Sequence, residues 1–236
     1  MPPRPYILIS CEHGGNEVPP RFAQLLDGAE GVLEGHRGWD PGALAISRRL
    51  AGALGAPLFH TAVTRLLVDC NRSLHSPTLF TEFSRALSPD ARAALLRKYY
   101  HPHRDAVAAE ARRAIEAGGR AVHLSMHTFT PMFNGLRRSC DVGLLYDPSR
   151  PLERSYCADL KGKLSTIAPG LRVRRNYPYR GTYDALVTTL RRELPAESYL
   201  GIEIEMNQEF PVRDPAGWEG LQDAVVAAVK EKTERE

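Results

Sequence analysis

The sequence predicts an α/β protein in which helices cover both faces of a mostly parallel, mixed sheet. Short apolar runs that suit strands alternate along the chain with longer amphipathic runs that suit helices. The chain has 236 residues, of which 43% are hydrophobic and 25% charged, so it is long enough to bury a sizeable core. We therefore expect one domain over residues 1–236.

The strands are expected where short apolar runs lie between turn residues. The first of them, YILIS, precedes a turn-rich segment with two glycines, and the last, YLGIEIEM, has the same apolar character. In chain order the expected strands are residues 6–10, 57–62, 66–70, 120–126, 141–146, 171–175 and 199–206.

The helices are expected where apolar residues recur three or four positions apart. In residues 41–54 this spacing forms one apolar face, with arginines on the other. Residues 89–117 suit one long helix or a pair, because Pro102 removes a backbone donor within the run. Two glycines then end that run. The remaining helices are expected at residues 152–167, 183–194 and 216–232.

Composition argues against several classes of partner. The net charge is only +3 and the arginines form no basic stripe with interleaved aromatics, so nucleic acid is not an expected partner. The N-terminus lacks the pattern of a signal peptide, and no apolar run approaches the ~18 residues that span a bilayer. The cysteines form no CxxC pair and suit reduced thiols in a cytoplasmic protein; they are Cys11, Cys70, Cys140 and Cys157.

Two histidines follow strands at the carboxyl edge of the sheet, where open α/β proteins bind ligands. His13 comes three residues after the first expected strand, and the glycines behind it let the backbone approach an ion. A lone loop histidine more often bonds to backbone, but His127 at the end of AVHLSMH changes that interpretation. His123 is interpreted as a buried, hydrogen-bonded histidine. Two imidazoles with one carboxylate can hold zinc and leave a position open for water.

Two acidic residues compete for the place of the third ligand. Asp40 precedes Pro41 at an expected helix start, so it could bind a metal, cap the helix, or do both. Glu17 follows the histidine segment, but the prolines after it also suit a turn beside a solvated charge. These residue patterns leave both choices open.

The segment TRLLVDCNRS suits the binding of a carboxylate. Arg72 offers a planar guanidinium, and Asn71 can donate a further hydrogen bond. Arg65 lies near the start of the same segment, and Asp69 follows its apolar run. A strand-ending turn with a surface arginine would give the same pattern.

Two further segments offer catalytic and substrate-binding groups. Glu203 and Glu205 share one face of an otherwise apolar strand, where a buried carboxylate costs free energy unless it is partnered or functional. Glu205 is nearer the carboxyl end and is the expected general base. In the loop RNYPYRGTYD, Tyr179 and Arg180 could reach a substrate, although a connecting turn with exposed aromatics would look the same.

Taken together, these segments resemble the N-formylglutamate amidohydrolase family. The motifs that carry the resemblance occur in the family's order; they are SCEHGGNEVP, HRGWDPGA, RLLVDCNRS, SMHTFTP, NYPYRG and IEIEMNQ. The family is similar to zinc carboxypeptidases, so the resemblance implies a zinc carboxypeptidase-like fold and a zinc cofactor. It also implies hydrolysis of the amide bond of an N-acyl amino acid, such as N-formylglutamate to formate and glutamate.

The resemblance also implies roles for particular residues. His13 and His127 become zinc ligands, and Glu205 becomes the catalytic carboxylate. Asn71 and Arg72 become the clamp for the substrate carboxylate, because VDCNR is similar to the segment with which zinc carboxypeptidases hold a terminal carboxylate. Arg65 is a further candidate for this clamp. In the mechanism that we predict, Arg65 is also the arginine expected to hold the oxyanion.

One departure from the carboxypeptidase pattern bears on the third ligand. Those enzymes place a glutamate three residues after the first histidine, where this chain has Asn16. We therefore favour Asp40 over Glu17. Two other functions compete with the expected one: a zinc amidase or peptidase for short peptides or cell-wall fragments, and a non-catalytic module that binds small carboxylates.

Overall fold

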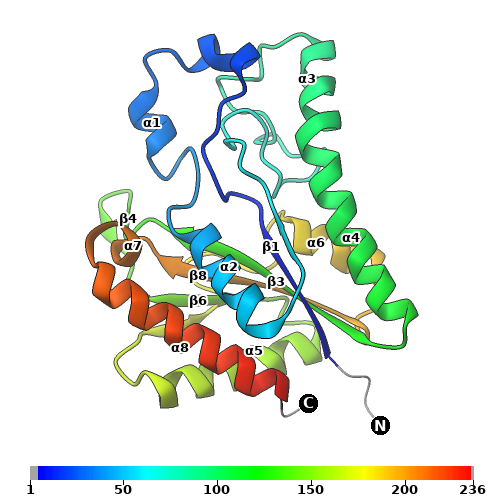
Figure 1. The fold of residues 1–236 in the computed structure, drawn as a ribbon, viewed down its shortest axis with the longest axis vertical. Helices are drawn as coiled ribbons and strands as arrows, with labels where there is room; N and C mark the ends of the chain where they lie inside the picture. Colours follow the sequence, from blue (N-terminus) through cyan, green and yellow to red (C-terminus); the bar gives the residue numbers. More distant parts are fainter. Residues whose placement is uncertain (1–4, 235–236) are drawn as a thin grey trace.

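A six-stranded sheet forms the centre of the protein in the computed structural model, which describes residues 5–234 (Figure 1). The strand order is β2-β1-β3-β8-β6-β7. The first four strands in this order are parallel, whereas β6 is antiparallel to β8 and parallel to β7. The strands are β1 (Pro5–Cys11), β2 (Leu58–His60), β3 (Arg120–Phe129), β6 (Val142–Leu145), β7 (Val173–Arg175) and β8 (Tyr199–Asn207).

Helices pack on both faces of this sheet, so the predicted α/β class is confirmed. The helices α2, α5 and α8 cover one face, while α4 and α6 pack on the other. The α-helices are α1 (Glu30–Glu34), α2 (Ala43–Leu54), α3 (Pro89–Leu95), α4 (His101–Glu116), α5 (Pro151–Ile167), α6 (Leu186–Glu193), α7 (Glu209–Arg213) and α8 (Pro215–Glu234). A 3-10 helix spans Pro20–Leu26, and a small hairpin joins β4 (Met132–Phe133) to β5 (Leu136–Arg137).

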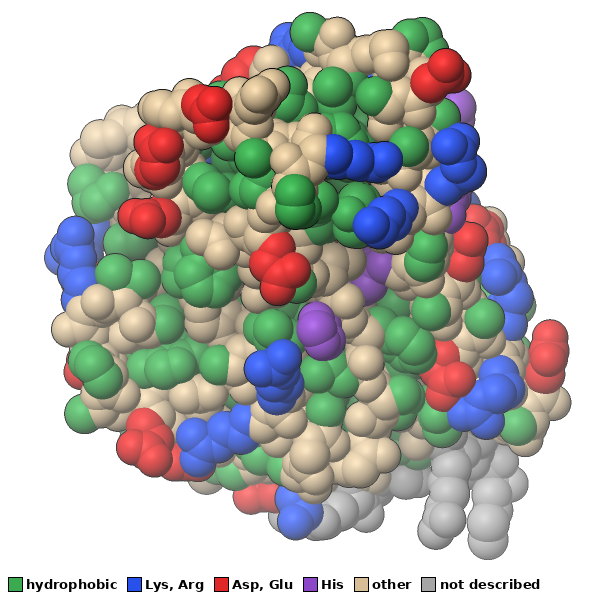
Figure 2. Space-filling model, turned by 45° about the horizontal axis from the view of Figure 1, so that its top comes forward, with side chains coloured by type: hydrophobic (Ala, Val, Ile, Leu, Met, Phe, Trp, Pro, Cys, Tyr) green, Lys and Arg blue, Asp and Glu red, His purple; other side chains and the backbone are tan. Residues whose placement is uncertain are grey.

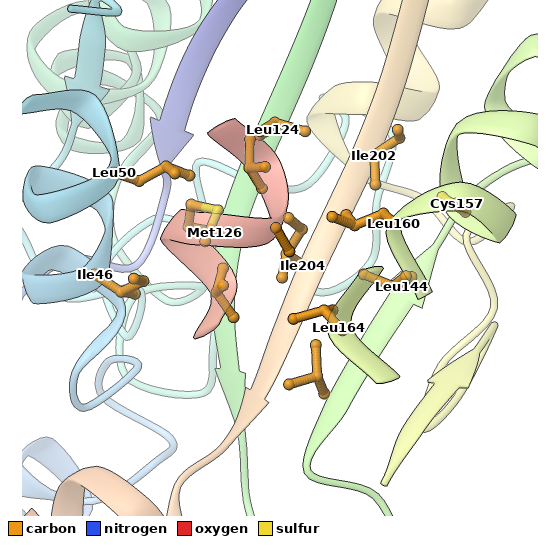
Figure 3. Close-up of a cluster of buried hydrophobic side chains, with 14 of the residues drawn as sticks. Ile46, Leu50, Leu124, Met126, Leu144, Cys157, Leu160, Leu164, Ile202 and Ile204 are labelled. Atoms are coloured by element: carbon orange, nitrogen blue, oxygen red, sulfur yellow. The ribbon is translucent and has the colours of Figure 1, made fainter. Parts of the chain in front are cut away.

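The larger core lies between the sheet and the layer of α2, α5 and α8. Figure 3 shows Ile46 and Leu50 of α2 pointing toward Met126 of β3, with Leu160 and Leu164 of α5 farther along the same layer. All five side chains are almost completely buried. Burial of a side chain of this size contributes roughly 1.5–3 kcal/mol, so this layer holds the sheet rigid behind the loops that extend from it.

Several predicted strands are shorter in the structure, such as β2 and β7, and two predicted elements differ more strongly. Residues 66–70 form no strand; Leu67, Val68 and Cys70 pack in a separate cluster with Leu79 and Leu95. A run of buried apolar residues suits either a strand or a buried loop, which is why periodicity misled here. The predicted helix at 183–194 begins only at Leu186.

The long helical run around Pro102 is continuous but irregular. A π turn at Leu96–Tyr100 joins α3 to α4, and Pro102 lies in the first turn of α4. The His101 amide donates to Leu96 O, across a turn wider than that of an α-helix. The proline therefore changes the helix locally without ending it.

The surface and the thiols agree with an ordinary mixed-charge domain. On the face shown in Figure 2, basic and acidic side chains are interspersed. The cysteines are all buried and unpaired. Among residues 5–234, no helix is both long and apolar enough to cross a membrane.

His123 is confirmed as a buried, hydrogen-bonded histidine, and it predicts sensitivity to acid. Its ring nitrogens contact Ser10 Oγ at 2.6 Å and Tyr199 OH at 2.8 Å. Burial lowers its pKa to about 4. The unfolded chain takes up this proton near the ordinary pKa of 6.5, so stability is lost as the pH falls from 6.5 to 4.

Replacing His123 with glutamine should remove this part of the pH dependence. Between pH 7 and pH 4 the variant should lose about 3 kcal/mol less unfolding free energy than the wild type. Urea unfolding at both pH values measures the difference. Identical pH dependence of the two proteins would contradict the assignment of a neutral, buried His123.

Candidate metal centre and active site

A cavity of about 170 Å³ opens at the carboxyl ends of β1, β3 and β8. Every residue that the sequence predicts for the site lines this cavity, although the role of each remains a prediction. They are His13, Asp40, Arg65, Asn71, Arg72, His127, Tyr179, Arg180 and Glu205. Residues more than 190 positions apart in the chain thus meet in one small space.

His13, Asp40 and His127 form a compact cluster that could hold a metal ion. His13 follows β1, His127 lies on β3, and Asp40 precedes α2. One potential ligand atom from each residue lies within 4.8 Å of the other two, and all three residues are buried. Asp40 Oδ2 is 2.9 Å from Nδ1 of His127 and 3.3 Å from Nδ1 of His13.

In each histidine, the Nε2 atom contacts a carboxylate that is not part of the cluster. Nε2 of His13 is 2.7 Å from Asp69 Oδ1, and Nε2 of His127 is 3.1 Å from Glu12 Oε2. In the neutral imidazole, a carboxylate partner favours the proton on Nε2, so a metal ion that displaces any proton on Nδ1 would meet a lone pair directed toward Asp40 and the other ring. This arrangement sets the tautomer that a metal ligand needs.

The charges around the cluster favour a cation in its centre. Burial alone would raise the pKa of Asp40, but the charge of Arg65 and the contacts with the two histidines hold it well below 3.8. Burial alone would lower the pKa of His127, but bonds with Asp40 and Glu12 raise it well above 6.5. The structure thus stabilises positive charge where two Nδ1 atoms and a carboxylate meet, and this donor set fits zinc.

The two candidates for the third ligand lie in different surroundings. The helix α2 begins at Ala43 with Gly42 as its N-cap, at φ 86°, and has no side-chain cap, so the alternative in which the Asp40 side chain caps this helix is excluded. That side chain points instead to the two histidines. Glu17 is exposed and pairs through its backbone with Val63. The geometry therefore favours Asp40.

Arg65 is held against the cluster by several contacts. One of its nitrogens donates to Asp40 Oδ1 at 2.7 Å, and another lies 3.0 Å from Nδ1 of His13. The guanidinium also donates to the carbonyl oxygens of His36, Arg37 and Trp39. Arg65 thus fixes the loop that carries Asp40 and places positive charge beside the proposed reaction centre.

Glu205 carries a carboxyl group suited to proton transfer. Its Oε2 atom is buried and has no hydrogen-bond partner among the described residues. Burial, together with the negative charges of Asp40 and Glu203, raises its pKa to about 8, against the opposing effect of His127. A carboxyl group with a pKa near the working pH can both accept and return a proton.

Asn71 and Arg72 have different surroundings. The Asn71 side chain is buried: Nδ2 donates to Glu203 Oε1 at 3.2 Å, and Oδ1 accepts from the Leu186 amide at 2.8 Å. These bonds tie the segment to β8 and α6. Arg72 is one-third exposed at the cavity wall and donates to the Asp184 carbonyl. Arg72 is therefore the better placed of the two for a substrate anion.

The loop with Tyr179 and Arg180 forms another wall of the cavity. Arg138 donates to Tyr179 OH at 3.1 Å and stacks on the rings of Tyr179 and Phe133, at 4.8 and 4.7 Å from their centroids. Arg138 thereby connects the β4–β5 hairpin to the loop. Arg180 is exposed at the mouth of the cavity.

Sequence reasoning assigned no role to Glu12, Asp69 or Arg138. Glu12 is a charged residue directly after a buried strand, and this was a usable signal because such a charge needs a partner. Asp69 was noted at the end of its segment, but its contact with His13 depends on how two loops fold. Arg138 is one arginine among many, and nothing local distinguishes it.

Comparison with known proteins gives the chain a family. The N-formylglutamate amidohydrolase family matches residues 6–210. A gene product from Agrobacterium tumefaciens is 29% identical, with a TM-score of 0.78 and coverage of 95% of this chain and 90% of that one. An N-formylglutamate amidohydrolase from Ralstonia eutropha shares the fold, with 18% identity, a TM-score of 0.73 and coverage of 97% and 93%.

No curated protein matches this chain significantly. The resemblance seen in the motifs is confirmed by the family match, which spans most of the sequence. This chain belongs to the N-formylglutamate amidohydrolase family.

Proposed function

We propose that this protein is a zinc-dependent hydrolase of N-acyl amino acids, with N-formylglutamate as the leading substrate. The products would be formate and glutamate. The observation that carries the proposal is the convergence of His13, Asp40 and His127 beside a carboxyl group of raised pKa, in one small cavity. Family membership supports the same reaction class.

The three converging residues would hold the metal through two imidazole nitrogens and one carboxylate oxygen. When bound, zinc would supply Lewis-acid polarisation and lower the pKa of water toward ~7. Glu205 would accept a proton from the attacking water and deliver it to the leaving nitrogen. Arg65 would stabilise the negative charge that develops on the acyl oxygen.

Arg72 would bind the carboxylate of the amino acid and so orient the scissile bond. The exposed Arg180 at the cavity mouth offers a second positive charge. A cavity of about 170 Å³ suits a single amino-acid derivative better than an extended peptide. The size of the site therefore favours N-acyl amino acids over peptides or cell-wall fragments.

The decisive experiment combines metal analysis with product release. Purified protein should contain zinc and release formate from N-formylglutamate; a chelator should stop release, and added zinc should restore it. A panel of other N-acyl amino acids, dipeptides and cell-wall fragments tests the substrate class. Zinc binding with dipeptide cleavage alone would support a peptidase, and carboxylate binding without any hydrolysis would support a non-catalytic module.

A further inference from the structure

His103 lies outside the cavity that contains the metal cluster. It belongs to the first turn of α4 and lines a separate groove of about 910 Å³, which Glu17, His60 and Lys98 also line. The His103 side chain is nevertheless almost fully buried, at 4% exposed. An apolar side chain could fill this buried position. A histidine there needs an explanation, because its polar ring atoms cost free energy when they are buried without partners.

His103 contacts the cluster through Glu12. Its Nε2 atom is 3.4 Å from Glu12 Oε1, and the Glu12 side chain is completely buried. The other oxygen of Glu12 lies 3.1 Å from Nε2 of His127 and accepts from Ser125 Oγ at 2.8 Å. A continuous row of contacts therefore runs from the groove, through a carboxylate, to one of the proposed ligands.

The two carboxylate oxygens of Glu12 thus contact different partners. Oε2 faces His127 and Ser125, while Oε1 is turned toward α4 and contacts His103. A carboxylate that orients a metal-binding histidine acts well only when its own position is set. Without His103, Oε1 would lose this contact in a buried place, and the carboxylate would turn or draw in water.

We propose that His103 is a positioning residue for the metal centre: it fixes Glu12, which in turn holds His127 in the orientation that binds zinc. The inference rests on the proposed function, because it assigns a remote side chain to the same site. His103 touches neither the substrate cavity nor the three proposed ligands, and it acts only through Glu12.

Two polar replacements of different reach test this role. In His103→Gln, the amide nitrogen can occupy nearly the place of Nε2 and still donate to Glu12. In His103→Asn the side chain is too short to do so. Zinc affinity, measured by competition with a chromophoric chelator, should fall about tenfold or more in His103→Asn and stay near the wild-type value in His103→Gln.

A second readout follows the geometry of the centre directly. The visible absorption of the cobalt-substituted protein should change in His103→Asn but match the wild type in His103→Gln. A purely structural role of His103 would not produce this difference between the two variants. The matched control is the pair His60→Asn and His60→Gln, because His60 is exposed in the same groove. Both should bind zinc like the wild type.

The outcomes separate the two proposals. A wild-type protein without zinc affinity would overturn the proposed function, and this inference with it. A wild type that binds zinc, with His103→Asn binding it equally well, would overturn the inference alone. If His103→Asn does not fold, His103→Leu provides the test, since it fills the space without a donor; unchanged zinc affinity in that variant would have the same negative meaning.

Discussion

Replacing Glu205 with glutamine should lower turnover by about 10²–10⁴-fold while zinc remains bound. The substitution keeps the size of the side chain but removes its ability to take a proton from water. Glu205 lines the cavity and is not one of the three clustered ligands, so metal affinity should change little. Formate release and zinc content, measured on the same preparation, check both parts.

The neighbouring Glu203 supplies the matched control. It lies on the same strand and lines the same cavity, but its Oε1 already accepts a hydrogen bond from Asn71, whereas Glu205 Oε2 has no hydrogen-bond partner among the described residues. Glu203→Gln should therefore reduce turnover much less than Glu205→Gln. A Glu205→Gln variant with near wild-type turnover, or a larger loss in Glu203→Gln, would exclude Glu205 as the general base.

Glu205→Gln should also change how the stability of the metal-free protein depends on pH. The raised pKa means that folded Glu205 holds its proton up to about pH 8, whereas the unfolded chain releases it near 4.5. The unfolded state therefore binds fewer protons across this window, and wild-type stability falls as the pH rises. Glutamine removes this effect, so its advantage over the wild type should grow from pH 4.5 to 8 and then level off in urea unfolding.

The convergence of the site could be predicted because parallel strands end at a common edge. The register pairs His127 with Glu205 and places β1 beside β3, so residues at these strand ends meet whatever the intervening loops do. Glu205 was identifiable for a further reason: a carboxylate in an apolar strand needs a partner or a function. Local pattern and sheet topology were sufficient for this part of the site.

Other features depend on contacts that no local pattern contains. The antiparallel direction of β6 could not be predicted from the sequence, because the apolar pattern of a strand is the same whichever way the strand runs in the sheet. The carboxylates behind the histidines depend on the packing of separate segments: Asp69 reaches His13 from a loop, and Glu12 reaches both His127 and the helix α4. The reach of a buried loop side chain is set by tertiary packing, which the spacing of residues does not encode.

Replacing Asp40 with asparagine should cause the largest loss of zinc binding among single conservative changes at the site. Asp40 Oδ2 is close to both Nδ1 atoms, and Oδ1 accepts from Arg65. The neutral amide would leave the Arg65 charge without its partner and weaken attraction for a cation. Zinc affinity should fall by more than the roughly 10–100-fold that loss of a partner behind a ligand costs, and turnover should fall with it.

Glu17→Gln is the matched control, because Glu17 is the alternative third ligand and the substitution has the same chemistry. Its exposed side chain is not part of the His13, Asp40 and His127 cluster and does not line the cavity, which implies zinc affinity and turnover close to those of the wild type. Chelator competition on both variants separates the two assignments, provided that circular dichroism shows both to be folded. If Glu17→Gln loses zinc while Asp40→Asn retains it, the ligand set is His13, Glu17 and His127, and the loop bearing the glutamate must move inward when metal binds.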